Sequence, residues 1–205
     1  MFIKQTVSIL FCSLFLFSNL NAAQPTEPAK VMKEDSMMKM MEQMQKATSP
    51  NENHKVFNAL VGQWEHVGKW WMAADKKAEE FKGTNINQLI LGNRFLQQSA
   101  KGQMMGQPFE GIGITGYDNM KAEYTSIWLD NMNTGMMSAT SQFDAATKTF
   151  AEKGSLSCPM TGEKNKMFRT IWKIMDNDHY SYEMYSNGPD GKEFKNMEIL
   201  YSRVK

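Results

Sequence analysis

From residue 51 onward, apolar and polar side chains alternate over short segments that turn residues divide. Alternation with a period of two predicts strands that bury one face. The first segment, 62–72, has Trp64, His66 and Trp70 on the apolar face. Nine more segments follow, at 85–91, 94–100, 109–117, 124–129, 136–143, 147–153, 167–175 and about 180–184 and 197–201.

Two groups of residues rich in glycine add detail to this pattern of strands. Gly92 and Asn93 separate the second and third segments and predict a hairpin with positive φ at both turn positions. Gly111, Gly113 and Gly116 lie inside or at the end of a strand segment, where glycine marks a bend, a bulge or a close approach of another group to the backbone.

Short strands at spacings of about 8–12 residues, with short turns and hardly a helix, predict an all-β fold. We expect residues 51–205 to form a single antiparallel up-and-down β-barrel of about ten strands. A sandwich is the alternative, but sandwiches usually need long crossover connections. A barrel of this size leaves an interior that side chains need not fill, so it can hold a ligand.

The beginning of the chain lacks this alternation. Residues 1–22 are predicted to be a cleaved signal peptide, because Lys4 precedes an apolar stretch at 7–17 and small residues follow it. The stretch is short of the roughly 20 apolar residues that cross a bilayer, which argues against an uncleaved anchor. Cys12 follows the bulky Phe11, which does not fit a lipid-attachment site. We expect an exported, periplasmic protein without a transmembrane segment in the mature chain.

Residues 23–50 are expected to contain a linker and a methionine-rich amphipathic helix. The helix is predicted to begin at a cap on Asp35 or Ser36 and to end near Lys46. Methionines recur at spacings of three and four, which places them on one helix face. They are Met37, Met40, Met41 and Met44.

Composition narrows the function. The 205 residues include 23 Lys and Arg against 22 Asp and Glu, and removal of Lys4 with the signal peptide leaves no net charge. Nucleic acid is therefore excluded as a partner, because phosphate binding needs a cationic excess or patch. Loss of Cys12 leaves Cys158 as the single cysteine, so the mature monomer is held together by packing without an internal disulfide.

Several short segments together resemble one bacterial family. They are His54 and the segments 60–64, 92–96, 108–111, 116–118, 128–130, 134–135 and 197–203. The family is known as a domain of unknown function, number one-five-seven-nine, and the resemblance runs from about Ala47 to Arg203. It implies a lipocalin-like or calycin-like barrel and no established activity. It also implies that Gly62 and Trp64 open the first strand and that Arg203 packs over Trp64, a cation–π contact worth roughly 0.5–2 kcal/mol.

Aromatic residues on the predicted inner face suggest the function. These rings either fill the barrel or line a pocket for a small apolar or amphipathic molecule, which the protein would bind without catalysis. The candidate ligand-binding residues are Trp64, His66, Trp70, Tyr124, Trp128, Trp172, Tyr180, Tyr182 and Met184. No nucleophile motif or acid–base pair stands out, so a binding protein is favoured over an enzyme.

Other chemistry remains open. The Met37, Met40, Met41 and Met44 stripe, joined by His54, could bind Cu(I), because soft sulfur ligands suit that ion. The same stripe could instead pack the helix on the barrel as flexible apolar filler, or dock on a partner protein. His66 could ligate haem iron, although a single histidine among aromatic residues is no motif. The cofactor and the oligomeric state stay unknown.

Overall fold

The computed structural model describes residues 33–188 and 190–205, so the predicted signal peptide at 1–22 and most of the linker lie outside the described residues. Three helical elements precede ten strands. The helices are α1 (Glu34–Thr48), α2 (Glu52–Lys55) and the 3-10 helix η1 (Val56–Ala59). The strands are β1 (Gly62–Trp70), β2 (Glu79–Ile90), β3 (Phe95–Met104), β4 (Gln107–Asp118), β5 (Glu123–Asp130), β6 (Met137–Asp144), β7 (Thr149–Leu156), β8 (Lys166–Ile174), β9 (His179–Asn187) and β10 (Glu193–Arg203).

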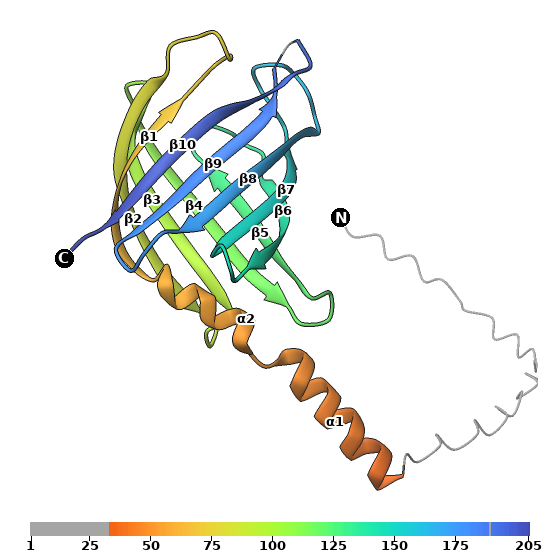
Figure 1. Cartoon of the computed structure of the whole chain (residues 1–205). Helices are drawn as coiled ribbons and strands as arrows, with labels where there is room; N and C mark the ends of the chain where they lie inside the picture. The colour runs from red at the N-terminus through yellow and green to blue at the C-terminus, as the bar shows by residue number, and fades with distance from the viewer. Residues whose placement is uncertain (1–32, 189) are drawn as a thin grey trace, which may run out of the picture.

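The ten strands form a closed antiparallel barrel (Figure 1). Each strand pairs with its neighbours in sequence, and β1 pairs with β10 to close the sheet, with Trp64 opposite Arg203. The predicted up-and-down barrel is confirmed, and the sandwich alternative is wrong. The predicted hairpin is also confirmed, with φ of 67° at Gly92 and 63° at Asn93, but its turn comprises residues 91–94 and Leu91 also has a positive φ of 50°.

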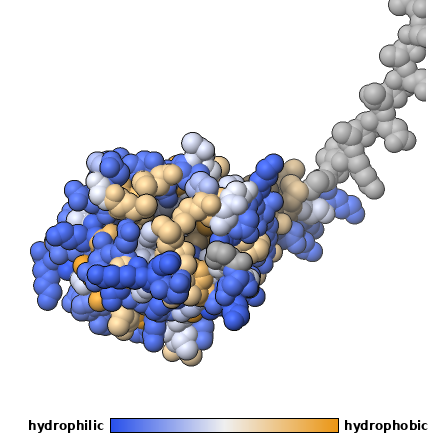
Figure 2. All heavy atoms as spheres, turned by 90° about the horizontal axis from the view of Figure 1, so that it is seen from above, coloured by the Kyte–Doolittle hydropathy of each residue, from blue (hydrophilic) through white to orange (hydrophobic). Residues whose placement is uncertain are grey.

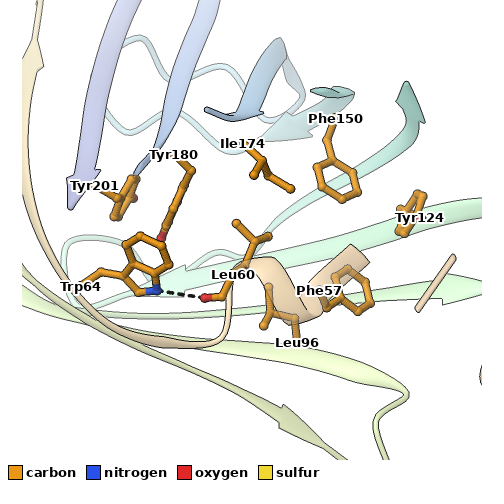
Figure 3. Close-up of a cluster of buried hydrophobic side chains, with 9 residues drawn as sticks. All are labelled: Phe57, Leu60, Trp64, Leu96, Tyr124, Phe150, Ile174, Tyr180 and Tyr201. Atoms are coloured by element: carbon orange, nitrogen blue, oxygen red, sulfur yellow. Dashed lines mark hydrogen bonds between the residues drawn. The ribbon is translucent and has the colours of Figure 1, made fainter. Parts of the chain in front are cut away.

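One end of the barrel is filled. Residues 52–60, which we call the plug, form α2 and η1 and place Phe57 and Leu60 among aromatic side chains of the strands (Figure 3). The carbonyl of Leu60 accepts hydrogen bonds from Trp64 Nε1 at 2.9 Å and from Asn87 Nδ2 at 3.0 Å. The buried cluster consists of Phe57, Leu60, Trp64, Leu96, Tyr124, Phe150, Ile174, Tyr180 and Tyr201. The plug thereby gives this half of the barrel a packed core.

Helix α1 extends away from the plugged end of the barrel (Figure 1). None of its residues is buried, and its five methionines are exposed by 44% to 62%. The idea that the stripe Met37, Met40, Met41 and Met44 packs the helix on the barrel is therefore wrong, because no barrel surface faces it. The helix is held near its end, where Asn119 Nδ2 lies within hydrogen-bond distance of the carbonyls of Lys46, Ala47 and Ser49. Arg94 Nε also donates to the carbonyl of Thr48 at 3.1 Å.

Candidate functional site: a cavity in the open half of the barrel

The half of the barrel away from the plug contains a cavity of about 190 Å³. Its wall comes from the ends of the strands opposite the plug and is mostly apolar and aromatic. The larger rings in the wall are Phe81, Phe109, Trp128, Phe168, Trp172, Tyr182 and Tyr201. The barrel is therefore neither completely filled nor completely hollow.

The structure divides the nine residues that the alternation placed inside the barrel. His66, Trp128, Trp172, Tyr182 and Met184 line the cavity. Trp64, Tyr124 and Tyr180 belong to the packed core around the plug. Trp70 is half-buried at the end of β1 and does not line the cavity. Alternation gives the face of a strand but not the depth at which a residue lies, which the plug determines here.

The sequence analysis missed Glu152, a buried carboxylate in the cavity wall. Its side chain is on the inner face of β7 and the residue is only 8% exposed. Three neutral groups donate hydrogen bonds to it: Ser126 Oγ to Oε1 at 3.0 Å, Trp172 Nε1 to Oε2 at 2.9 Å, and Thr170 Oγ1 to Oε2. The signal was present, because Glu152 is two residues from Phe150 and therefore in phase with the apolar face.

A second polar group of side chains lies on β1, β2 and β3. His66 Nδ1, Asn85 Oδ1 and Gln98 Nε2 are buried, line the cavity walls, and have no hydrogen-bond partner within the described part of the chain. Burial lowers the pKa of His66 below 6.5, so the imidazole is neutral at pH 7. Such buried polar atoms call for water or a ligand as a partner.

Glycines let two rings approach the backbone. A Cβ on Gly83 would lie 2.8 Å from Nε2 of His66, and a Cβ on Gly111 would lie 2.3 Å from the ring of Trp128. Of the roles open to Gly111 in the sequence analysis, the close approach of another group is therefore the one observed. Trp128 Nε1 also donates to Asp130 Oδ2 at 2.8 Å, which orients the ring in the cavity wall.

Methionines surround the open end. Met104, Met132, Met137, Met184 and Met197 line the cavity. Further methionines at this end are exposed, namely Met72, Met105, Met136, Met160 and Met167. Seen from this end, apolar side chains gather across part of the face between hydrophilic ones (Figure 2). Because methionine is flexible and polarizable, this rim can adapt to molecules of different shape.

At the plugged end, Arg203 joins the first and last strands. Its guanidinium carbon lies 4.1 Å from the centroid of the Trp64 ring. Arg203 Nη1 donates to the carbonyl of Val61 at 2.6 Å, and Nη2 donates to that of Ala59 at 3.0 Å. Gly62 has a φ of 131°, and a Cβ there would lie 2.5 Å from Nη1. Glycine thus leaves the space that the guanidinium occupies.

The histidines considered for metal or haem lie apart from the exposed methionine stripe of α1. His54 is buried in the plug, where its Nδ1 accepts a hydrogen bond from the backbone N–H of Asn51 at 3.1 Å, so it is not part of the exposed methionine stripe. Within the described ranges no group of three His, Cys, Asp or Glu side chains could hold a metal ion. The cavity around His66 is smaller than the roughly 300–1,000 Å³ of pockets for drug-sized ligands.

Cys158 lies in the turn between β7 and β8 and is half-buried. Burial raises the pKa of its thiol, but hydrogen bonds from Thr161 and Met160 outweigh burial and bring the pKa below its ordinary value. It is the one cysteine among the described residues, and it does not line the cavity.

Comparisons with solved structures show the same fold. The Rv2717c protein from M. tuberculosis superimposes with a TM-score of 0.59 at 12% identity, covering 77% of this chain and 100% of that one. The S-type phycobiliprotein lyase CPES from Guillardia theta superimposes with a TM-score of 0.53 at 11% identity, covering 80% of this chain and 97% of the lyase. At these identities the likeness extends to the fold alone.

Two other comparisons concern similarity at the level of the amino-acid sequence. A search of curated proteins finds no match. In the part of the chain that the structure describes, no helix has the length and apolar character needed to cross a membrane. The model of the family described as protein of unknown function, DUF1579, matches residues 49–203, which include the plug and the whole barrel. The chain therefore belongs to the DUF1579 family.

Proposed function

We propose that this barrel binds a small, mostly apolar molecule with a few polar groups and does not change it chemically. The observation that carries the proposal is the cavity of about 190 Å³, whose aromatic wall contains buried polar atoms that have no partner among the described residues. A cavity of about 150 Å³ lined by apolar side chains is large enough for benzene. The ligand is therefore of the size of one aromatic ring with short substituents.

Export belongs to the same proposal. It rests on the apolar stretch after Lys4 and on the small residues that follow it. A periplasmic barrel that keeps its ligand from water would serve to carry or to sense that molecule. The barrel needs no disulfide for this, because its sheet is closed and one end is packed around Phe57.

The test is native mass spectrometry of the protein purified from cells without added ligand, together with titration of the protein with benzyl alcohol followed by tryptophan fluorescence. We expect a discrete excess mass and saturable binding of benzyl alcohol. The variant Ala139→Leu fills the cavity and should reduce both, whereas Thr140→Leu on the outer face of the same strand should not. A bare mass and no saturable binding, or equal effects of the two variants, would show the proposal to be wrong.

A second candidate function concerns α1. Its stripe Met37, Met40, Met41 and Met44 is exposed to solvent, which leaves the thioethers available to Cu(I). Replacing these four methionines by leucine keeps the apolar face and removes the sulfur ligands. Cu(I) binding that survives this replacement would exclude the stripe as the site.

A further inference from the structure

We propose that the ligand of the cavity is an organic cation, an apolar ring bearing an ammonium group, and that Glu152 is its counter-charge. This inference rests on the proposed function, because it names the class of molecule that the same cavity takes. Three observations support it: Glu152 is buried in the cavity wall, its hydrogen-bond donors are all neutral, and aromatic rings lie beside it.

The charge of Glu152 is uncompensated within the described structure. None of the ion pairs formed by described residues includes Glu152. Its partners across the strands are Ser141 on β6 and Thr170 on β8, which are uncharged. Burying a carboxylate without a cation is costly, so a cationic ligand would gain most of its affinity here.

The carboxylate also has room for one more donor. Two carboxylate oxygens offer about four acceptor positions. Oε2 accepts from Thr170 and Trp172, whereas Oε1 accepts only from Ser126. The three existing bonds fix the side chain in the wall of the cavity. A free acceptor position on Oε1 therefore remains for an N–H group of the ligand.

Aromatic rings beside Glu152 favour the same ligand. Trp172 donates to the carboxylate, and its ring packs edge-on against that of Tyr182, with centroids 4.8 Å apart. Trp128 lines the same cavity. The electron-rich face of an aromatic ring attracts a cation, most strongly where water is excluded. A carboxylate and several rings in one cavity are thus suited to an ammonium group on an apolar body.

The polar atoms on the other side of the barrel do not neutralise Glu152. His66, Asn85 and Gln98 come from β1, β2 and β3, whereas Glu152 comes from β7, about half of the closed sheet away. The amides are uncharged, and His66 is neutral because it is buried. They can accept from or donate to a second polar substituent on the ligand. An anionic ligand would meet only repulsion from Glu152.

Three probes of similar size test the inference: benzylammonium, benzyl alcohol and benzoate, each titrated into the whole protein near neutral pH. We expect benzylammonium to bind at least about tenfold more tightly than benzyl alcohol, and benzoate to bind least. The variant Glu152→Gln should lose the preference for the cation and keep the binding of benzyl alcohol. Glu65→Gln, which removes one charge from the outer face of β1, is the matched control and should keep the preference.

The outcomes separate this inference from the proposed function. Binding of benzyl alcohol that equals or exceeds that of benzylammonium contradicts the cation but leaves a small-molecule cavity in place. A preference that persists in Glu152→Gln contradicts the role of this carboxylate. If none of the probes binds, both ideas are wrong. The ranking in the unaltered protein decides the ligand class even if Glu152→Gln does not fold.

Discussion

The guanidinium of Arg203 connects the chain that enters the barrel with the chain that leaves it. It donates to carbonyls of Ala59 and Val61 before β1 and, through Nε, to the carbonyl of Asn177 at 2.8 Å. A lysine keeps the charge but has no planar fork to serve three acceptors. We expect Arg203→Lys to lower the free energy of unfolding in urea by about 1–3 kcal/mol.

The matched control for Arg203→Lys is Arg169→Lys. Arg169 also makes two hydrogen bonds, to the carboxylate of Glu193 at 2.8 and 2.7 Å, but this pair is exposed. Arg169→Lys should therefore lower the free energy of unfolding by less than about 1 kcal/mol. Equal effects of the two substitutions would contradict a special role of Arg203 in holding the barrel end together.

At the residue scale, the sequence predicted which side chains point inward but not what they meet. Alternation placed His66, Tyr182 and Met184 on the inner face, and all three line the cavity. It did not reveal the bonds of Glu152, because its donors come from β5 and β8, 26 and 18 to 20 positions away. Only the pairing of β5, β6, β7 and β8 at a particular register brings these groups together.

Among the elements, α1 is held near its end by Asn119 of the β4–β5 turn and by Arg94, whose Nε donates to the carbonyl of Thr48. Asn119 Nδ2 lies 2.8 Å from the carbonyl of Ser49, and Asn119 Oδ1 accepts from Asn51 at 2.9 Å. We expect Asn119→Ala to accelerate hydrogen exchange of amides in residues 34–48, because the carbonyls at the helix end lose their partner. Exchange within the strands should change little.

A comparable asparagine serves as the control for the helix. Asn133 lies in the turn between β5 and β6 at the other end of the barrel and donates to the carbonyl of Ser157 at 2.9 Å. Asn133→Ala should leave exchange in α1 unchanged. Unchanged exchange in Asn119→Ala as well would mean that the helix is held by other contacts, such as Arg94 Nε with the carbonyl of Thr48.

The elements show where sequence reasoning stops. The methionine spacing predicted a helix near Asp35 to Lys46, and α1 spans Glu34–Thr48. The pattern could not show that this helix lies away from the barrel, because an exposed and a docked apolar stripe have the same periodicity. The plug was missed since α2 and η1 are four residues each, too short for a periodic signal.

For the whole molecule, two buried histidines predict a loss of stability in weak acid. Burial lowers the pKa of both, with Arg94 adding to the effect at His54. The unfolded chain therefore takes up these protons first, at its ordinary pKa of about 6.5. Their stabilising contribution is present above that pH and is lost as the pH falls through the folded pKa values, by at most about 1.4 kcal/mol per pH unit for each histidine.

Urea unfolding measured between about pH 7.5 and 5.5 checks this prediction. His66→Gln should make the dependence shallower, whereas the control His179→Gln removes a partly exposed imidazole that lies beside Asp176. Hydrogen bonds from nearby backbone and side-chain groups lower the pKa values of carboxyl groups such as Asp118 and Asp144. These groups therefore change the stability only when the pH is below their ordinary pKa of 3.8. A slope that stays the same in His66→Gln would contradict the assignment to this residue.

The pairing of β1 with β10 sets the order in which the molecule can be completed. Trp64 faces Arg203 across this seam, so the first strand finds its second neighbour only when nearly the whole chain has been synthesised. Contacts between such distant parts of a sequence form slowly. A nascent chain of this kind stays open at the seam during translation. That delay would be compatible with the proposed export, which requires the chain to cross a membrane unfolded and to close its barrel afterwards.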